Sequence, residues 1–152
     1  MLEASGGRRS VESSHPKALL ACSHPQTLRT LLSMLWQCGV KPIAASSVRG
    51  VRAASAYYPV ALVFCEDHLP GGGFETVLQI PRLRECGARV VVCSRSGEVE
   101  TYLAAMDRGV FDFLCPPFRL PDIQAILDRL GKGRNPARLS AAPEEQYRRA
   151  RA

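Results

Sequence analysis

Short apolar runs alternate along the chain with segments in which large apolar residues recur every three or four positions. Five runs predict strands, at residues 17–22, 41–46, 60–65, 89–94 and 110–115. The runs "VALVFC" and "RVVVCS" are apolar at consecutive positions, which is typical of strands that are buried on both faces.

A segment with helical spacing follows each run. Leu28, Leu31, Leu32 and Leu35 predict the first helix, which ends near Gly39. Residues 47–58 predict a weakly patterned second helix, and a third follows the loop "EDHLPGGG" and continues to about Leu83. The fourth, "GEVETYLAAMDRG", has Val99, Leu103 and Met106 on one side. The fifth has Pro121 in its first turn, with an apolar face made by Ile123, Ile126, Leu127 and Leu130.

This alternation predicts an α/β fold with a five-stranded parallel sheet and helices on both faces. Right-handed crossovers leave few topologies for such a chain. In sheets of this kind, functional side chains gather beyond the carboxyl ends of the strands. We therefore look for the site where each run ends.

Length and charge divide the chain of 152 residues into three parts. We expect a flexible segment at 1–16, one domain at 17–131 and a basic tail at 132–152. The tail holds six basic and two acidic residues, so it supplies +4 of the net charge of +6. A solvated tail is favoured over a nucleic-acid contact. Neither a membrane span nor a signal peptide is evident, which predicts a cytoplasmic protein.

Six cysteines lack paired CxxC spacing and lie mostly in apolar runs, namely Cys22, Cys38, Cys65, Cys86, Cys93 and Cys115. This pattern predicts reduced, buried thiols and no disulfide framework.

Three stretches carry a family resemblance: "VFCEDHLPGGGFE", "VVVCSRSGEVETYLAAMDRGVFDFL" and the "PF" that follows it. Residues 17 to about 132 resemble the receiver domain of bacterial two-component response regulators. The resemblance implies the flavodoxin-like strand order 2-1-3-4-5. It also implies partners such as a kinase, another receiver or an output protein, with no membrane contact.

The resemblance further implies five functional positions, and this chain departs from most of them. Cys22 and Ser23 stand where the family has an acidic pair that holds Mg²⁺. Glu66, four residues before the loop proline, stands at the phosphoacceptor aspartate, and Ser94 fits the family's Thr or Ser. Pro116 stands at the lysine, so that "CPPF" replaces "xKPF". The bond between Pro116 and Pro117 is expected to be cis, as in the family.

These departures predict that phosphorelay chemistry is lost. Phosphoryl transfer needs a metal ion and a cation to neutralise the transferred group. A thiol and a hydroxyl cannot replace the carboxylates that Mg²⁺ prefers, and proline supplies neither a cation nor an N–H. Asp67 is a substitute acceptor only if the strand has already ended, because side chains alternate along a strand. We expect no metal, no cofactor and no enzymatic activity.

Two interpretations of Glu66 remain open. It either mimics a phosphorylated aspartate or is a solvated carboxylate, and without a lysine at 116 the second is favoured. Ser94 and Phe113 fit the family's switch pair, although Phe113 is also a candidate core residue. Tyr102 is expected to be exposed on the fourth helix, on a face through which the chain dimerises weakly.

The sequence thus predicts a stand-alone degenerate receiver, or pseudo-receiver, that signals through protein contacts. About 20 residues follow residue 131, too few for an output domain. One alternative is an adaptor whose basic tail touches nucleic acid. Another is a transition-metal or redox site at Cys22, His24, Glu66, Asp67 and His68, which lack a local spacing motif. "LPGGG" is interpreted as a turn and not as an anion cradle.

Overall fold

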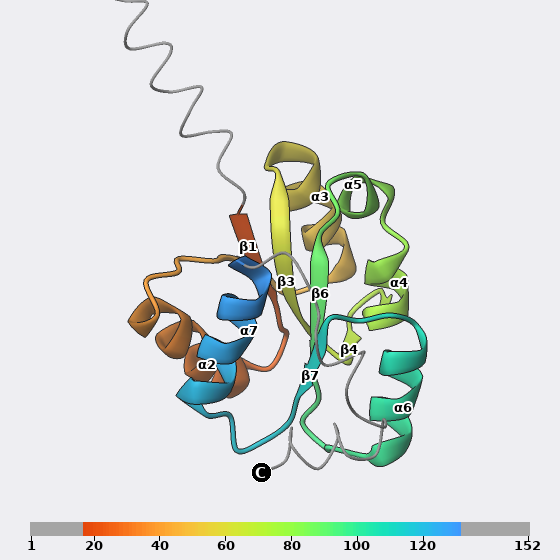
Figure 1. Ribbon diagram of the computed structural model, residues 1–152. Coiled ribbons are helices and arrows are strands. Elements are labelled where there is room, and N and C mark those ends of the chain that lie inside the picture. Colours follow the sequence, from red (N-terminus) through yellow and green to blue (C-terminus); the bar gives the residue numbers. More distant parts are fainter. Residues whose placement is uncertain (1–16, 132–152) are drawn as a thin grey trace, which may run out of the picture.

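The computed structural model describes residues 17–131, which form a sheet covered by helices on both faces (Figure 1). The main strands are β1 (Lys17–Ala21), β2 (Ile43–Ala45), β3 (Val60–Glu66), β6 (Arg89–Cys93) and β7 (Asp112–Leu114). The helices are α2 (Pro25–Gln37), α3 (Val48–Tyr57), α4 (Phe74–Leu78), α5 (Pro81–Glu85), α6 (Val99–Asp107) and α7 (Leu120–Gly131). The expectations for 1–16 and 132–152 lie outside the described residues.

The five main strands are parallel and lie in the order β2-β1-β3-β6-β7. Counted among these five, this is the expected order 2-1-3-4-5, so the predicted fold class is confirmed. The register places Ala21 beside Cys65 and Glu66 beside Cys93. The residues that follow β1, β3 and β6 therefore emerge next to one another at the same edge of the sheet.

Apolar side chains on the two faces of the sheet form two separate cores. Residues from α3, α4, α5 and α6 pack in one core, which includes Val51, Val77 and Tyr102. Residues from α2 and α7 pack in the other, which includes Leu31 and Ile123. Consecutive residues of β3 contribute to opposite cores, which explains why this strand is apolar throughout.

The segment after β3 differs from the single helix that the sequence predicted. It forms the short helices α4 and α5, because Pro81 lacks an N–H and begins a new helix after Ile80. The glycine-rich loop also contains a hairpin of β4 (His68–Leu69) and β5 (Gly72–Gly73). Gly72 has φ +149°, and a Cβ there would lie 2.4 Å from Thr76 Oγ1. This turn therefore requires glycine for structural reasons.

Two further expectations are decided by the described residues. The Pro116–Pro117 peptide bond is cis, as predicted. All six cysteines are free thiols, but only four are buried, because Cys86 is exposed and Cys38 is half-buried. The expectation that the thiols are generally buried was therefore wrong for these two residues, which lie near the ends of helices. Within residues 17–131, no helix is long and apolar enough to cross a membrane.

Candidate functional site

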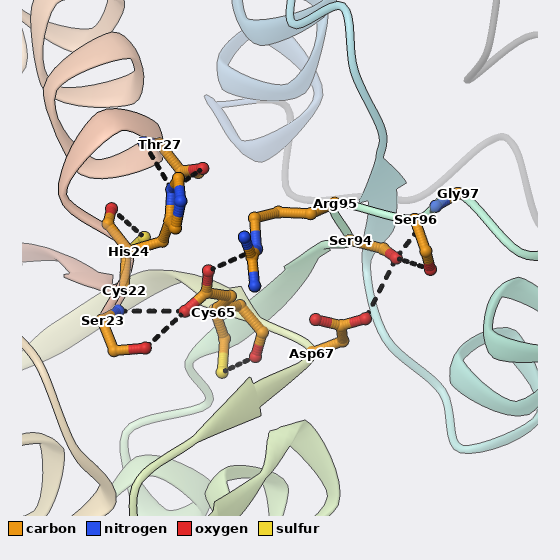
Figure 2. A network of polar contacts seen from close by, with 11 residues as sticks. Cys22, Ser23, His24, Thr27, Cys65, Asp67, Ser94, Arg95, Ser96 and Gly97 are labelled. Atoms are coloured by element: carbon orange, nitrogen blue, oxygen red, sulfur yellow. Dashed lines mark hydrogen bonds and ion pairs between the residues drawn. The ribbon is translucent and has the colours of Figure 1, made fainter.

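Polar side chains gather where β1, β3 and β6 end (Figure 2). Ser23 lies just beyond β1, Glu66 is the last residue of β3, and Ser94 directly follows β6. Because these strands are neighbours in the sheet, their ends bring together residues far apart in the sequence. These polar side chains thus meet at the carboxyl ends of three neighbouring strands.

Glu66 is at the centre of this network and is 3% exposed. Its Oε1 accepts hydrogen bonds from the Ser23 backbone N–H at 3.0 Å and from the Ser23 hydroxyl at 2.9 Å. Its Oε2 lies 3.4 Å from Nε of Arg95. The interpretation of Glu66 as a solvated carboxylate was therefore wrong, because both oxygens face groups of this chain.

Arg95 supplies a cation to this network that the sequence analysis did not identify. Its side chain is 55% exposed, whereas the carboxylate that it contacts is buried. Oε2 of Glu66 nevertheless accepts no aligned hydrogen bond within residues 17–131. The contact with Arg95 is thus an ion pair whose strength is mainly electrostatic. Arg95 directly follows Ser94 in the sequence. Because β6 adjoins β3, this position near the strand end was the signal that could have identified Arg95 as a partner of Glu66.

Ser94 and Asp67 form a second part of the network. The fully buried Ser94 hydroxyl donates to Oδ2 of Asp67 at 3.0 Å. Oγ of Ser94 also accepts a hydrogen bond from the backbone N–H of Gly97 at 3.2 Å and lies 3.2 Å from Oγ of Ser96. β3 ends at Glu66, so Asp67 no longer follows the alternation of the strand. The strand thus ends before Asp67, as was required for its side chain to lie with the other polar groups at the strand ends.

Cys22 and His24, two of the residues predicted for a metal or redox site, have other partners in the structure. The Cys22 thiol donates to the His24 carbonyl at 3.4 Å. Nδ1 of His24 accepts the backbone N–H of Thr27 and caps α2, so that the ring turns toward this helix (Figure 2). Burial, with a smaller contribution from the Glu66 carboxylate, raises the pKa of the Cys22 thiol to about 11. Within residues 17–131, no group of three or more His, Cys, Asp or Glu side chains is arranged to hold a metal ion.

Tyr102 and Phe113 lie in the interior and not on a surface. They are 1% and 0% exposed, and their rings meet edge to face with centroids 5.3 Å apart. The expectation that Tyr102 is exposed was wrong, because α6 turns Tyr102 and Ala105 toward the sheet. Val99 and Leu103, which the sequence placed on one side of this helix with Met106, are 41% and 38% exposed. The larger aromatic side chain takes the buried position, where it removes more apolar surface from water.

Pro116 lies in the loop after β7 and is exposed. β7 is separated from β3 by β6, so Pro116 follows a strand that does not adjoin β3. Its position next to the cis bond matches the turn expected there. The only cation that pairs with Glu66 within residues 17–131 is therefore Arg95.

The solved structures that resemble this fold are receiver domains. The receiver domain of NtrX from Brucella abortus matches with a TM-score of 0.67 and 23% identity, covering 75% of this chain and 97% of that one. The receiver domain of the sensor histidine kinase PA1611 from Pseudomonas aeruginosa, solved with a magnesium ion in its active-site cleft, has the same TM-score and 18% identity. This match covers 76% of this chain and 98% of that domain. The chain thus has the receiver-domain fold.

Two curated response regulators are similar in sequence. The response regulator protein PilR from Pseudomonas aeruginosa is 26% identical over 123 residues, which are 81% of this chain and 28% of PilR. The photosynthetic apparatus regulatory protein RegA from Rhodovulum sulfidophilum is 27% identical over 112 residues, which are 74% of this chain and 61% of RegA. The chain thus spans less than two thirds of the length of either relative. No protein-family model matches it.

Proposed function

We propose that this chain is a pseudo-receiver, a signalling module that acts through protein contacts and accepts no phosphoryl group. The observation that carries the proposal is that Glu66 is buried and held by partners within the chain. At the position that corresponds to the phosphoacceptor, the carboxylate is buried, receives two hydrogen bonds from Ser23 and is paired with Arg95. Burial shields this carboxylate from a phosphodonor, and its charge takes up the cation that a phosphoryl group would need.

The charge balance at the strand ends supports the same conclusion. An incoming phosphoryl group needs a metal ion and a cation to offset its charge. Cys22 and Ser23 offer a thiol and a hydroxyl in place of carboxylates, and Pro116 offers no cation. Arg95 is cationic, but its charge is already compensated by Glu66. No positive charge is left over in this network.

The ion pair also favours a fixed structural state. Glu66 links the end of β3 to Ser23 beyond β1 and to Arg95 beyond β6. A receiver that gains and loses a phosphoryl group switches between two states. In this chain the charges of Glu66 and Arg95 are both always present. We propose that Glu66 and Arg95 hold the three loops in one arrangement. This favours a constitutive role for Glu66 similar to that of a phosphorylated residue.

The partners that fit this proposal are proteins of a signalling system: a kinase, another receiver or an output protein. A module with no phosphorylation step exerts its effect by occupying such a partner and not by catalysis. The nucleic-acid alternative rests on the basic charge of 132–152. A DNA-mobility shift that depends on salt and is lost on deletion of 132–152 would favour this alternative.

The test is exposure of the full-length chain to acetyl phosphate and Mg²⁺, followed by intact mass analysis. We expect an unchanged mass for the chain and for Glu66→Asp, which restores the acceptor but not the metal site or the cation. The matched comparison combines Cys22→Asp, Ser23→Asp, Glu66→Asp, Arg95→Ala and Pro116→Lys. In this variant we expect phosphorylation. An acid-labile phosphoryl group on Glu66 or Asp67 of the unaltered chain would contradict the proposal.

A further inference from the structure

The outer side of α6 presents apolar and acidic side chains together. Val99 and Leu103 are exposed on it, and Met106 is half-buried next to them. Glu98, Glu100 and Asp107 are exposed, and residues 98–107 contain no basic side chain. Leu103, Ala104, Met106 and Asp107 line an open hollow of about 560 Å³. We call this the acidic surface.

The outer side of α2 has the opposite character. Trp36 is 54% exposed, although tryptophan is the side chain with most apolar surface to bury. Nζ of Lys41 lies 4.8 Å from the centre of its ring, and Arg29 is exposed two turns earlier on the same side of the helix. We call these three residues the basic surface.

The sequence around the basic surface carries charge of only one sign. No acidic residue occurs from residue 17 to residue 65, and the charged residues there are Lys17, Arg29, Lys41, Arg49 and Arg52. Arg49 and Arg52 lie in α3, on the other face of the sheet, so a partner that covers Trp36 meets Arg29 and Lys41. Two cations beside an apolar ring favour an acidic surface with an apolar centre.

The two surfaces also match in spacing. Arg29 and Trp36 are seven residues apart on α2, and Glu100 and Asp107 are seven apart on α6. Seven residues span about 10 Å of helix and return to nearly the same side. With Trp36 in the hollow next to Asp107, Lys41 approaches Asp107, and Arg29 reaches Glu100 if the two helices run parallel.

We propose that the acidic surface of one copy binds the basic surface of a second copy, so that the chain associates head to tail. α2 and α6 pack on opposite faces of the sheet, so a single copy cannot join its own two surfaces (Figure 1). Within residues 17–131, Arg29, Glu100 and Asp107 form no ion pair, so these charges are available for a partner. Each bound pair of copies keeps one free surface of each kind, so the association continues to larger species.

The contact is small, which sets the strength of the association. One helix face on each side buries less than the area typical of stable interfaces, so the complexes are transient. Charge complementarity of this kind is weakened by salt. We therefore expect association at protein concentrations of about 0.1–1 mM in dilute salt, and its reversal in about 0.5 M salt.

Sedimentation velocity of the full-length chain over a concentration series tests the proposal. We expect the weight-average sedimentation coefficient to rise with concentration, and Trp36→Ala or Leu103→Asp each to weaken association about tenfold or more. Tyr57→Ala, which removes an exposed aromatic residue outside both surfaces, is the matched control and should leave association unchanged. Thermal melts confirm that each variant is folded.

Mixing the two variants decides the geometry. Trp36→Ala keeps an intact acidic surface and Leu103→Asp an intact basic surface, so an equimolar mixture should form one-to-one dimers that grow no further. Arg29→Glu should weaken association and Glu100→Arg should restore it in the double variant. A chain that stays monomeric at about 1 mM overturns the proposal. So does an association that Leu103→Asp abolishes and Trp36→Ala leaves intact, which would indicate a symmetric contact through α6.

Discussion

Removal of the Arg95 side chain is the most direct perturbation of the ion pair that defines the site. In Arg95→Ala, the Glu66 carboxylate keeps the two hydrogen bonds from Ser23 at Oε1 but loses the only cation that pairs with Oε2 within residues 17–131. Loss of one partner from a fully buried pair costs about 3–5 kcal/mol, and from an exposed pair at most about 1 kcal/mol. Glu66 is buried and Arg95 is 55% exposed, so we expect a loss of about 1.5 kcal/mol of unfolding free energy.

A double-mutant cycle separates the ion pair from other effects of the substitution. Glu66→Gln keeps the shape of the side chain and an acceptor for Ser23, but it removes the charge. If the carboxylate is what Arg95 stabilises, the double variant should lose less than the sum of the two single losses, with a coupling of about 1 kcal/mol. Arg52→Ala, at an exposed arginine without an ion pair within residues 17–131, should stay within about 0.5 kcal/mol of the unaltered chain.

Urea unfolding followed by far-ultraviolet circular dichroism measures these free energies at protein concentrations too low for association. The slope of the transition should be unchanged, and the melting temperature of Arg95→Ala should fall by about 6 °C for a domain of this length. The reasoning is refuted if Arg95→Ala is as stable as Arg52→Ala, or if the coupling with Glu66→Gln is near zero. Either result would mean that Arg95 only lies near the carboxylate.

Three further expectations test other parts of the structure. Gly72→Ala should destabilise the chain by more than Gly87→Ala, measured by urea unfolding, because both glycines have positive φ but only Gly72 would place its Cβ against Thr76. With an aromatic disulfide reagent at neutral pH, the exposed Cys86 should react first. The four buried thiols should react only after unfolding, namely Cys22, Cys65, Cys93 and Cys115. Rapid labelling of these four in the native state would contradict their burial. The unfolding free energy should also fall as pH rises from about 9 to about 11, because the pKa of Cys22 is about 11 in the folded chain and 9.0 without burial, so the native state holds the proton longer. Cys22→Ala should make this fall shallower, and an unchanged slope would exclude Cys22 as its source.

The alternation of strands and helices was accessible from sequence because continuous apolar runs predict the strands and apolar residues three or four positions apart predict the helices, whereas the strand order was implied by the family resemblance. Strands such as β3 are apolar at nearly every position, and a parallel strand covered by helices on both faces produces this pattern. The break between α4 and α5 also had a visible signal in Pro81. The orientation of α6 did not, because apolar residues occur at 99 and at every position from 102 to 106 and occupy more than one side of the helix.

The candidate site divides in the same way. Residues at strand ends, such as Glu66 and Ser94, are placed by the alternation of the strand and by the strand order. Arg95 belongs to a loop, and its long side chain reaches a carboxylate 29 positions earlier in the chain. No local pattern encodes that direction, since it depends on β6 lying next to β3 and on Glu66 pointing to the same edge. Glu66 was misjudged as solvated for the same reason.

The substitutions at the strand ends are linked by electrostatics and do not represent independent losses. A buried carboxylate is costly unless a cation and hydrogen-bond donors compensate it. At position 66 these partners are Arg95 and Ser23, so the absence of a lysine at 116 leaves no uncompensated charge. The converse also holds: an acidic residue at 23 would place a second negative charge next to Glu66 and remove the hydroxyl, one of the two donors to Oε1. Under the proposed function, a carboxylate at the metal position therefore conflicts with the present state of Glu66, and phosphoryl transfer would require positions 22, 23, 66, 95 and 116 to change together.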